Sequence, residues 1–154
     1  MYRILLVEDD PGIAQAVCAH LRQWELEARC VQNFRAVMDE FTAFDPQLVL
    51  LDTPGLHKPR SRLGDYMVKV VRESLADVEC AVLLVEPIAH VGEPEKILLQ
   101  RIREEKLPCV LCINKIDTVE RKDDLLAVIA AYSEVYPDFD AIIPISARTG
   151  DGLE

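Results

Sequence analysis

The feature that most constrains this chain is a repeated alternation of short apolar runs with longer amphipathic segments. The apolar runs lie at residues 4–7, 28–31, 48–51, 81–85, 110–113 and 141–145. Near-continuous apolar strands separated by helices are typical of a parallel sheet covered on both faces. We therefore expect an α/β fold, a three-layer α/β/α sandwich built on a mainly parallel sheet.

Helices are expected between these strands, at residues 11–24, 33–41, 63–75, 94–106 and 123–136. In the first of them Ile13, Val17 and Leu21 recur every four residues, which predicts one apolar face that ends at Trp24. Asn33 is placed to cap the second helix.

Composition excludes several classes of protein. Half of the 154 residues are hydrophobic, enough for one compact domain with a core. The net charge of −10 disfavours binding to nucleic acids or to anionic membranes. No stretch of the sequence suggests a dedicated protein partner.

The five cysteines show no disulfide framework, and neither a signal peptide nor an apolar stretch long enough to cross a bilayer is evident. We expect reduced, mostly buried thiols in a cytoplasmic protein.

Polar clusters follow the apolar runs and fall where ligands bind in parallel α/β sheets, at the carboxyl ends of the strands. They are Glu8-Asp9-Asp10, Asp52-Thr53-Pro54-Gly55, Glu86-Pro87, Asn114-Lys115-Ile116-Asp117 and Ser146-Ala147. If Glu8, Asp9 and Asp52 converge, their carboxylates suit Mg²⁺. The alternatives are that these acids cap helices and face water, and that Glu86 pairs with Lys115 to leave a metal-free edge.

Residues 2–52 resemble the first half of a response-regulator receiver domain, through Ile4-Leu5-Leu6-Val7-Glu8-Asp9-Asp10 and Asp45-Pro46-Gln47-Leu48-Val49-Leu50-Leu51-Asp52. The resemblance implies that Glu8 and Asp9 bind Mg²⁺, that Asp52 accepts a phosphoryl group and that Pro54 offers a carbonyl to the metal. It also implies a flavodoxin-like strand order, extended here to 2-1-3-4-5-6. The chain departs from the receiver pattern after Asp52: Glu86 stands where a hydroxyl residue is expected, and Ile116 follows Lys115 in place of proline.

Residues 52–154 resemble Era-type GTPases, through Asp52-Thr53-Pro54-Gly55, Asn114-Lys115-Ile116-Asp117 and Ser146-Ala147. In that family Asp52 would hold a Mg²⁺-bound water. Asp117 would accept hydrogen bonds from the guanine base, Lys115 would pack over it and Asn114 would tie neighbouring loops together. Ser146 and Ala147 would supply backbone donors to the guanine oxygen.

The glycine-rich phosphate loop of GTPases, Gly-x-x-x-x-Gly-Lys-Ser/Thr, is absent after the first strand, where acids stand instead. GTP hydrolysis is therefore not expected, so the protein is predicted not to be an enzyme. Mg²⁺ is the candidate cofactor, and GTP or GDP is expected to bind weakly, near millimolar.

The two resemblances meet at Asp52, which predicts a single hybrid domain over residues 1–154, receiver-like to residue 52 and GTPase-like from residue 53. We interpret the chain as an engineered chimera without a complete catalytic apparatus, although a natural rearrangement is the other possible origin. The alternative functions are a weak guanine-nucleotide-binding remnant and a phosphorelay receiver that uses Asp52.

Overall fold

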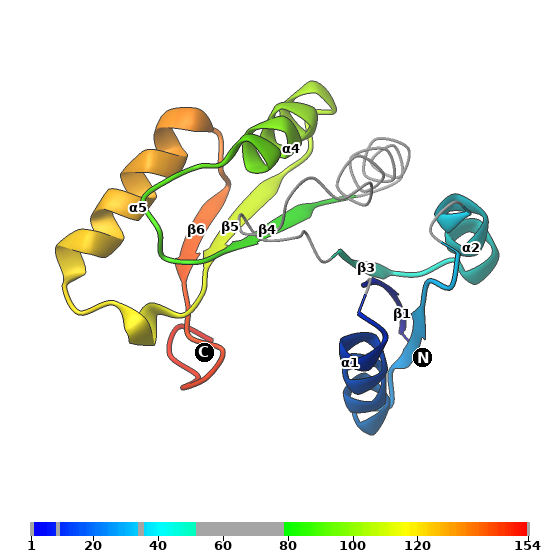
Figure 1. Ribbon diagram of the computed structural model, residues 1–154. Coiled ribbons are helices and arrows are strands. Elements are labelled where there is room, and N and C mark those ends of the chain that lie inside the picture. The colour runs from blue at the N-terminus through cyan, green and yellow to red at the C-terminus, as the bar shows by residue number, and fades with distance from the viewer. Residues whose placement is uncertain (1, 9, 34–35, 52–78, 154) are drawn as a thin grey trace. The chain divides into compact units, whose positions relative to one another are not determined.

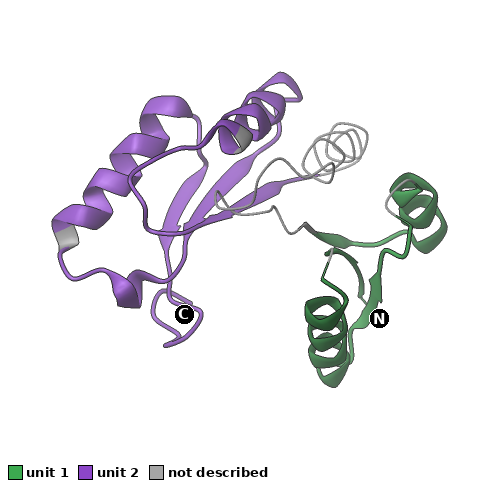
Figure 2. Cartoon of the chain, viewed as in Figure 1, with its two compact units in different colours: residues 1–74 green, residues 75–154 purple. Residues whose placement is uncertain are grey.

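A computed structural model describes residues 2–8, 10–33, 36–51 and 79–153. The chain divides into two compact units, Met1–Ser74 and Leu75–Glu154 (Figure 2). The expectation of one hybrid domain stays a prediction. The expected helix at residues 63–75 lies outside the described residues.

Unit 1 alternates strands and helices around a small parallel sheet (Figure 1). Its elements are β1 (Arg3–Val7), α1 (Pro11–Gln23), β2 (Glu27–Cys30), α2 (Val37–Phe44) and β3 (Leu48–Leu51). The strand order is β2-β1-β3, and both ladders are parallel. Because β1 is central, apolar residues cover both of its faces. One cluster joins Leu5 and Val7 to α2, and another joins Leu6 to α1.

The first helix packs through small residues rather than through its largest ones. Ala14 and Cys18 are buried against the sheet, whereas Ile13 is 52% exposed and Trp24 is 64% exposed. The expected apolar face is therefore found in part: Val17 and Leu21 pack against this cluster as predicted, whereas Ile13 does not. Asp10 caps this helix, accepting hydrogen bonds from the backbone N–H groups of Gly12 and Ile13 at 2.8 and 3.1 Å.

The second helix begins later than predicted. It starts at Val37, and its N-cap residue Ala36 makes no side-chain capping bond. Asn33 instead accepts a hydrogen bond from the Ala36 N–H through its backbone carbonyl at 2.9 Å. The prediction that Asn33 caps this helix is wrong, because the helix begins four residues after Asn33, with Ala36 at its N-cap.

Unit 2 contains a second parallel sheet and two long helices (Figure 1). Its elements are β4 (Ala81–Val85), α4 (Glu93–Glu104), β5 (Cys109–Ile113), the 3-10 turn η2 (Ile116–Thr118), α5 (Lys122–Val135) and β6 (Ala141–Pro144). The strand order is β4-β5-β6, with both ladders parallel. The fully buried residues Leu111 and Ile113 of β5 lie at the centre of a core shared with α4 and α5.

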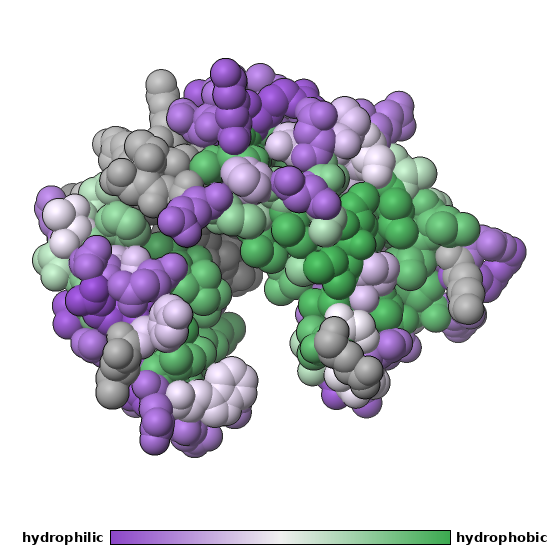
Figure 3. Space-filling model, turned by 180° about the vertical axis from the view of Figure 1, so that it is seen from behind, coloured by the Kyte–Doolittle hydropathy of each residue, from purple (hydrophilic) through white to green (hydrophobic). Residues whose placement is uncertain are grey.

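The opposite face of this sheet is apolar and open: Val82, Leu84 and Ile143 are exposed there. In Figure 3 hydrophobic residues gather in a broad patch over unit 2 as seen from behind.

The predicted fold class is confirmed, since parallel strands alternate with helices throughout the described chain. The predicted order 2-1-3-4-5-6 is found as two runs, 2-1-3 and 4-5-6, each in a three-stranded sheet of its own. The difference lies at the step from β3 to β4, which belong to different units and are joined by a segment outside the described residues. Within the described chain no helix has the length and apolar character needed to span a membrane.

The five cysteines, all of them described, are free thiols; two of them, Cys18 and Cys109, are buried, which is fewer than expected. Burial raises the pKa of the Cys109 thiol to about 12 and the pKa of the Tyr132 hydroxyl to about 12. Both groups are neutral when protonated. The folded protein therefore keeps these two protons at pH values where the unfolded chain has released them.

This difference predicts alkaline destabilisation. The stabilisation from Cys109 is complete below its ordinary pKa of 9.0 and is lost as the pH rises toward 12. Between its ordinary pKa and its raised pKa, each of the two groups should lower the free energy of unfolding by about 1.4 kcal/mol per pH unit. Urea denaturation in reducing buffer between about pH 8.5 and 10.5 should show a smaller decrease in the free energy of unfolding per pH unit for Cys109→Ala. Replacing the exposed Cys80 with alanine is the matched control, and equal slopes for the two variants would contradict the prediction.

Candidate ligand-binding site

The polar clusters that follow β5 and β6 in the sequence lie together in unit 2. Asn114 follows β5, and Ser146 lies two residues after β6. The Ile145 N–H donates to the carbonyl of Ile113 at 2.7 Å, and the Ile116 N–H donates to the carbonyl of Ile145 at 3.2 Å. These two bonds hold together the turns that follow the neighbouring strands, so Asp117 and Ser146, 29 positions apart along the chain, share one site.

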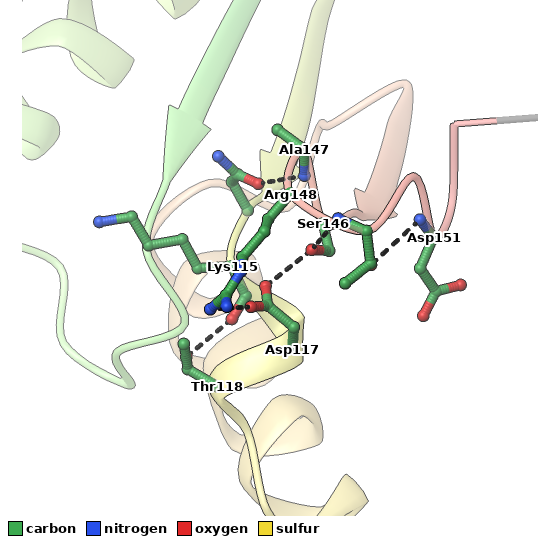
Figure 4. A network of polar contacts seen from close by, with 9 residues as sticks. Lys115, Asp117, Thr118, Ser146, Ala147, Arg148 and Asp151 are labelled. Carbon is green, nitrogen blue, oxygen red and sulfur yellow. Dashed lines mark hydrogen bonds and ion pairs between the residues drawn. The ribbon is translucent and has the colours of Figure 1, made fainter.

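The centre of the site is a bond between Asp117 and Ser146 (Figure 4). The buried Ser146 hydroxyl donates to Oδ1 of Asp117 at 2.7 Å, and the Thr149 N–H donates to the same hydroxyl oxygen at 3.2 Å. The Asp117 carboxylate is thereby fixed in one orientation. Its side chain remains 16% exposed, so a ligand can still reach it.

The second carboxylate oxygen of Asp117 forms a long ion pair with an exposed arginine. Its Oδ2 lies 3.8 Å from Nη1 of Arg148, whose side chain is 85% exposed (Figure 4). An ion pair of this length and exposure contributes little to stability. Oδ2 is therefore the atom of the site that a ligand's N–H donors can take at small cost.

The backbone donors predicted at Ser146 and Ala147 are already engaged. The Ser146 N–H donates to the carbonyl of Asp151 at 2.8 Å. The Ala147 N–H donates to Oδ1 of Asn114 at 2.9 Å. The expected loop-tying role of Asn114 thus agrees with its bond to Ala147, but a ligand would have to replace Asn114 to use that N–H.

Lys115 stands beside the site in a left-handed backbone conformation, with φ of 64°. Its carbonyl accepts hydrogen bonds from the N–H and hydroxyl of Thr118 at 2.9 and 2.7 Å. Its ammonium group forms an ion pair with Glu86, which follows β4. This pair was one of the alternatives that the sequence left open.

A turn that contains Gly150 and Gly152 follows Ser146 at the site, and the sequence did not lead us to expect it. Gly150 and Gly152 have φ of 85° and 74°, and a Cβ atom at Gly152 would lie 2.3 Å from the carbonyl oxygen of Pro144. The Gly150 N–H donates to the carbonyl of Ser146 at 2.8 Å. The Gly150-Asp151-Gly152 spacing, shortly after Ser146-Ala147, is the signal that could have identified this turn.

Of the four predicted metal ligands, only Glu8 lies within the described residues. Glu8 is nearly buried, and its Oε1 accepts a hydrogen bond from the Asp10 N–H at 2.9 Å. Asp9, Asp52 and Pro54 lie outside the described residues, as does the phospho-acceptor role of Asp52. Among the residues that the structure describes, no group of three or more His, Cys, Asp or Glu could hold a metal. The metal site stays a prediction, whereas Asp10 acts as the helix cap that the simpler alternative supposed.

Comparison with known proteins points to one family. The family profile of the elongation factor Tu GTP binding domain matches residues 13–154. GTPase Era of Ruminiclostridium cellulolyticum is 44% identical over 108 residues, which are 70% of this chain and 36% of that protein. GTPase Era of Clostridium novyi is 43% identical over 123 residues, 79% of this chain and 40% of that protein.

Among solved structures, a probable GTP-binding protein engB aligns with a TM-score of 0.56 at 17% identity, covering 99% of this chain and 92% of that one. At this identity the likeness shows the fold alone.

These findings correct two expectations. The interpretation as an engineered chimera with a receiver half is wrong, because the family match begins at residue 13 and spans the proposed join at Asp52. The expectation that the chain is not an enzyme is also contradicted, since its relatives carry the name GTPase. The missing phosphate loop and the receiver-like first strand are local features, whereas the family match extends over residues 13–154. The expectations about nucleic acid, membranes, protein partners and a cytoplasmic location stay predictions.

Proposed function

Because this chain belongs to the family of the elongation factor Tu GTP-binding domain, we propose that it binds guanine nucleotides, GTP and GDP, through the site around Asp117. The chain spans about two fifths of the length of the curated relatives that it matches, 36% and 40%. The proposal therefore concerns nucleotide binding by the residues in hand.

The orientation of the Asp117 carboxylate carries the proposal. Guanine presents two N–H donors side by side, on its ring nitrogen and its 2-amino group, and a carboxylate can accept both. Ser146 fixes Oδ1 at 2.7 Å, while the exposed Arg148 leaves Oδ2 accessible. Hydrogen bonds to an ionised acceptor are the strong ones, so this group can select guanine over adenine, which lacks both donors.

The guanine oxygen is proposed to take the N–H of Ala147. In the structure this donor is paired with Asn114 Oδ1 at 2.9 Å, so binding exchanges one acceptor for another and leaves no buried donor unsatisfied. Lys115, held at the rim of the site, would pack its methylene stem over the base. The family also implies Mg²⁺ at the nucleotide phosphates, and we propose Asp52 as its contact, as the Asp-Thr-Pro-Gly segment suggests.

Base selectivity tests this function. In calorimetric titrations with Mg²⁺, GDP should bind about 100-fold more tightly than ADP, because adenine forfeits two charge-assisted bonds to Asp117. The two ligands carry the same diphosphate, so ADP is the control for binding through phosphate alone. Equal affinities, or no binding of GDP, would refute the proposal.

A further inference from the structure

The ion pair between Glu86 and Lys115 has no role in the function proposed so far, although it lies at the edge of the proposed base site. Val85 of β4 pairs with Ile113 of β5, and the Asn114 N–H donates to the Val85 carbonyl at 2.8 Å. The ladder therefore continues one residue beyond both strand ends. It brings Glu86 level with Asn114, so Lys115, the next residue along the chain, lies close enough for its ammonium group to pair with Glu86.

The backbones on both sides of the pair are held by hydrogen bonds. The Ile88 N–H donates to the Glu86 carbonyl at 2.8 Å, and Thr118 donates twice to the Lys115 carbonyl. Lys115 also adopts a positive φ of 64°, a conformation that non-glycine residues keep only where their surroundings impose it. The direction in which the Lys115 side chain leaves the backbone is thus set before any ligand arrives.

Stability does not account for the pair. Both side chains are 55% exposed, and ion pairs of that exposure add little to folding. A free lysine side chain samples many rotamers, and ordering it on binding has an entropic cost. An ion pair that holds the side chain extended removes part of that cost. In Figure 4 the Lys115 side chain extends away from the Asp117 carboxylate, so the two residues leave the turn in different directions.

We propose that Glu86 is a positioning residue for nucleotide binding: it holds Lys115 extended so that the lysine stem is already in place when guanine arrives. The inference rests on the proposed function. It assigns to Glu86 no contact with the nucleotide. Its effect should therefore pass entirely through Lys115.

A double-mutant cycle tests this dependence. Glu86→Gln should weaken GDP binding by about threefold to tenfold, the range expected for ordering one flexible side chain. Lys115→Met keeps an apolar stem and removes the charge. In that background Glu86→Gln should have no further effect.

Glu93→Gln is the matched control, since it removes the same charge from an exposed pair with Lys96 on α4. It should leave GDP affinity unchanged. The thermal midpoint of Glu86→Gln without nucleotide should equal that of the unaltered chain.

Three results would overturn the inference while leaving the proposed function intact: unchanged or tighter GDP binding by Glu86→Gln, an equal loss in the Lys115→Met background, or an equal loss in Glu93→Gln. If the unaltered chain binds no GDP, the proposed function itself is wrong and this inference falls with it.

Discussion

Replacing Asp117 with alanine should weaken GDP binding by about 100-fold. The substitution removes the acceptor for two base donors, each bond to a charged group being worth about 1.5 to 3 kcal/mol, and part of the loss is recovered by water. It also leaves the buried Ser146 hydroxyl without its acceptor, although the Thr149 N–H still donates to that oxygen. Calorimetric titration at constant salt measures the change.

A second substitution at this position separates recognition from simple damage. Asp117→Asn offers an amide donor where the carboxylate had only acceptors. It should lose affinity for GDP and gain affinity for xanthosine diphosphate, whose base carries an oxygen in place of the 2-amino group.

Asp124→Ala is the charge-matched control, since Asp124 is exposed in the first turn of α5. Loss of GDP binding by this control, or an unchanged ratio of the two nucleotides in Asp117→Asn, would contradict the assignment of Asp117.

Gly152→Ala should have the second largest effect. Its φ of 74° already disfavours a side chain, and the new Cβ would lie 2.3 Å from the Pro144 carbonyl oxygen, so the backbone must shift. That shift displaces the turn in which Ser146 accepts from Gly150 and donates to Asp151. We expect a loss of about 2 to 3 kcal/mol in local stability and a GDP affinity lowered about tenfold or more.

Gly150→Ala is the control that places a side chain at a positive φ without a steric clash. Gly150 has φ of 85°, but an added Cβ would meet nothing within 4 Å. It should therefore incur only the backbone penalty, about 1 to 2 kcal/mol. Hydrogen exchange of the amides between Ser146 and Asp151 measures local opening, and titration measures affinity. If the two variants behave alike, contact with Pro144 does not determine the geometry of this turn.

The sequence by itself determined the elements and the place of the site. Short apolar runs located all six described strands to within one or two residues, because buried parallel strands tolerate few polar residues. The same pattern placed Asn114, Asp117 and Ser146 after strand ends, where the structure brings them together. Site residues of this kind can be predicted from the sequence because the carboxyl ends of parallel strands lie on the same edge of the sheet.

Sequence periodicity located the buried face of α1 only in part: Val17 and Leu21 pack on the core as predicted. A period of 3.6 residues marks an apolar side, but Ala14 and Cys18 face the sheet while Ile13 is exposed, because close approach of helix and sheet favours small residues. The capping preference of asparagine also misled at Asn33, whose backbone carbonyl, and not its side chain, meets the Ala36 N–H ahead of α2.

Only the tertiary structure decided which donor meets which acceptor in the site. The Ser-Ala motif predicts that the Ala147 N–H donates to a ligand. In the structure it donates to Oδ1 of Asn114, which lies 33 positions earlier in the chain. Likewise Lys115 meets Glu86 only because β4 and β5 are neighbours in register. Whether a donor meets an acceptor depends on differences of a few tenths of an ångström in the distance between groups on separate strands. Spacing along the chain carries no such information.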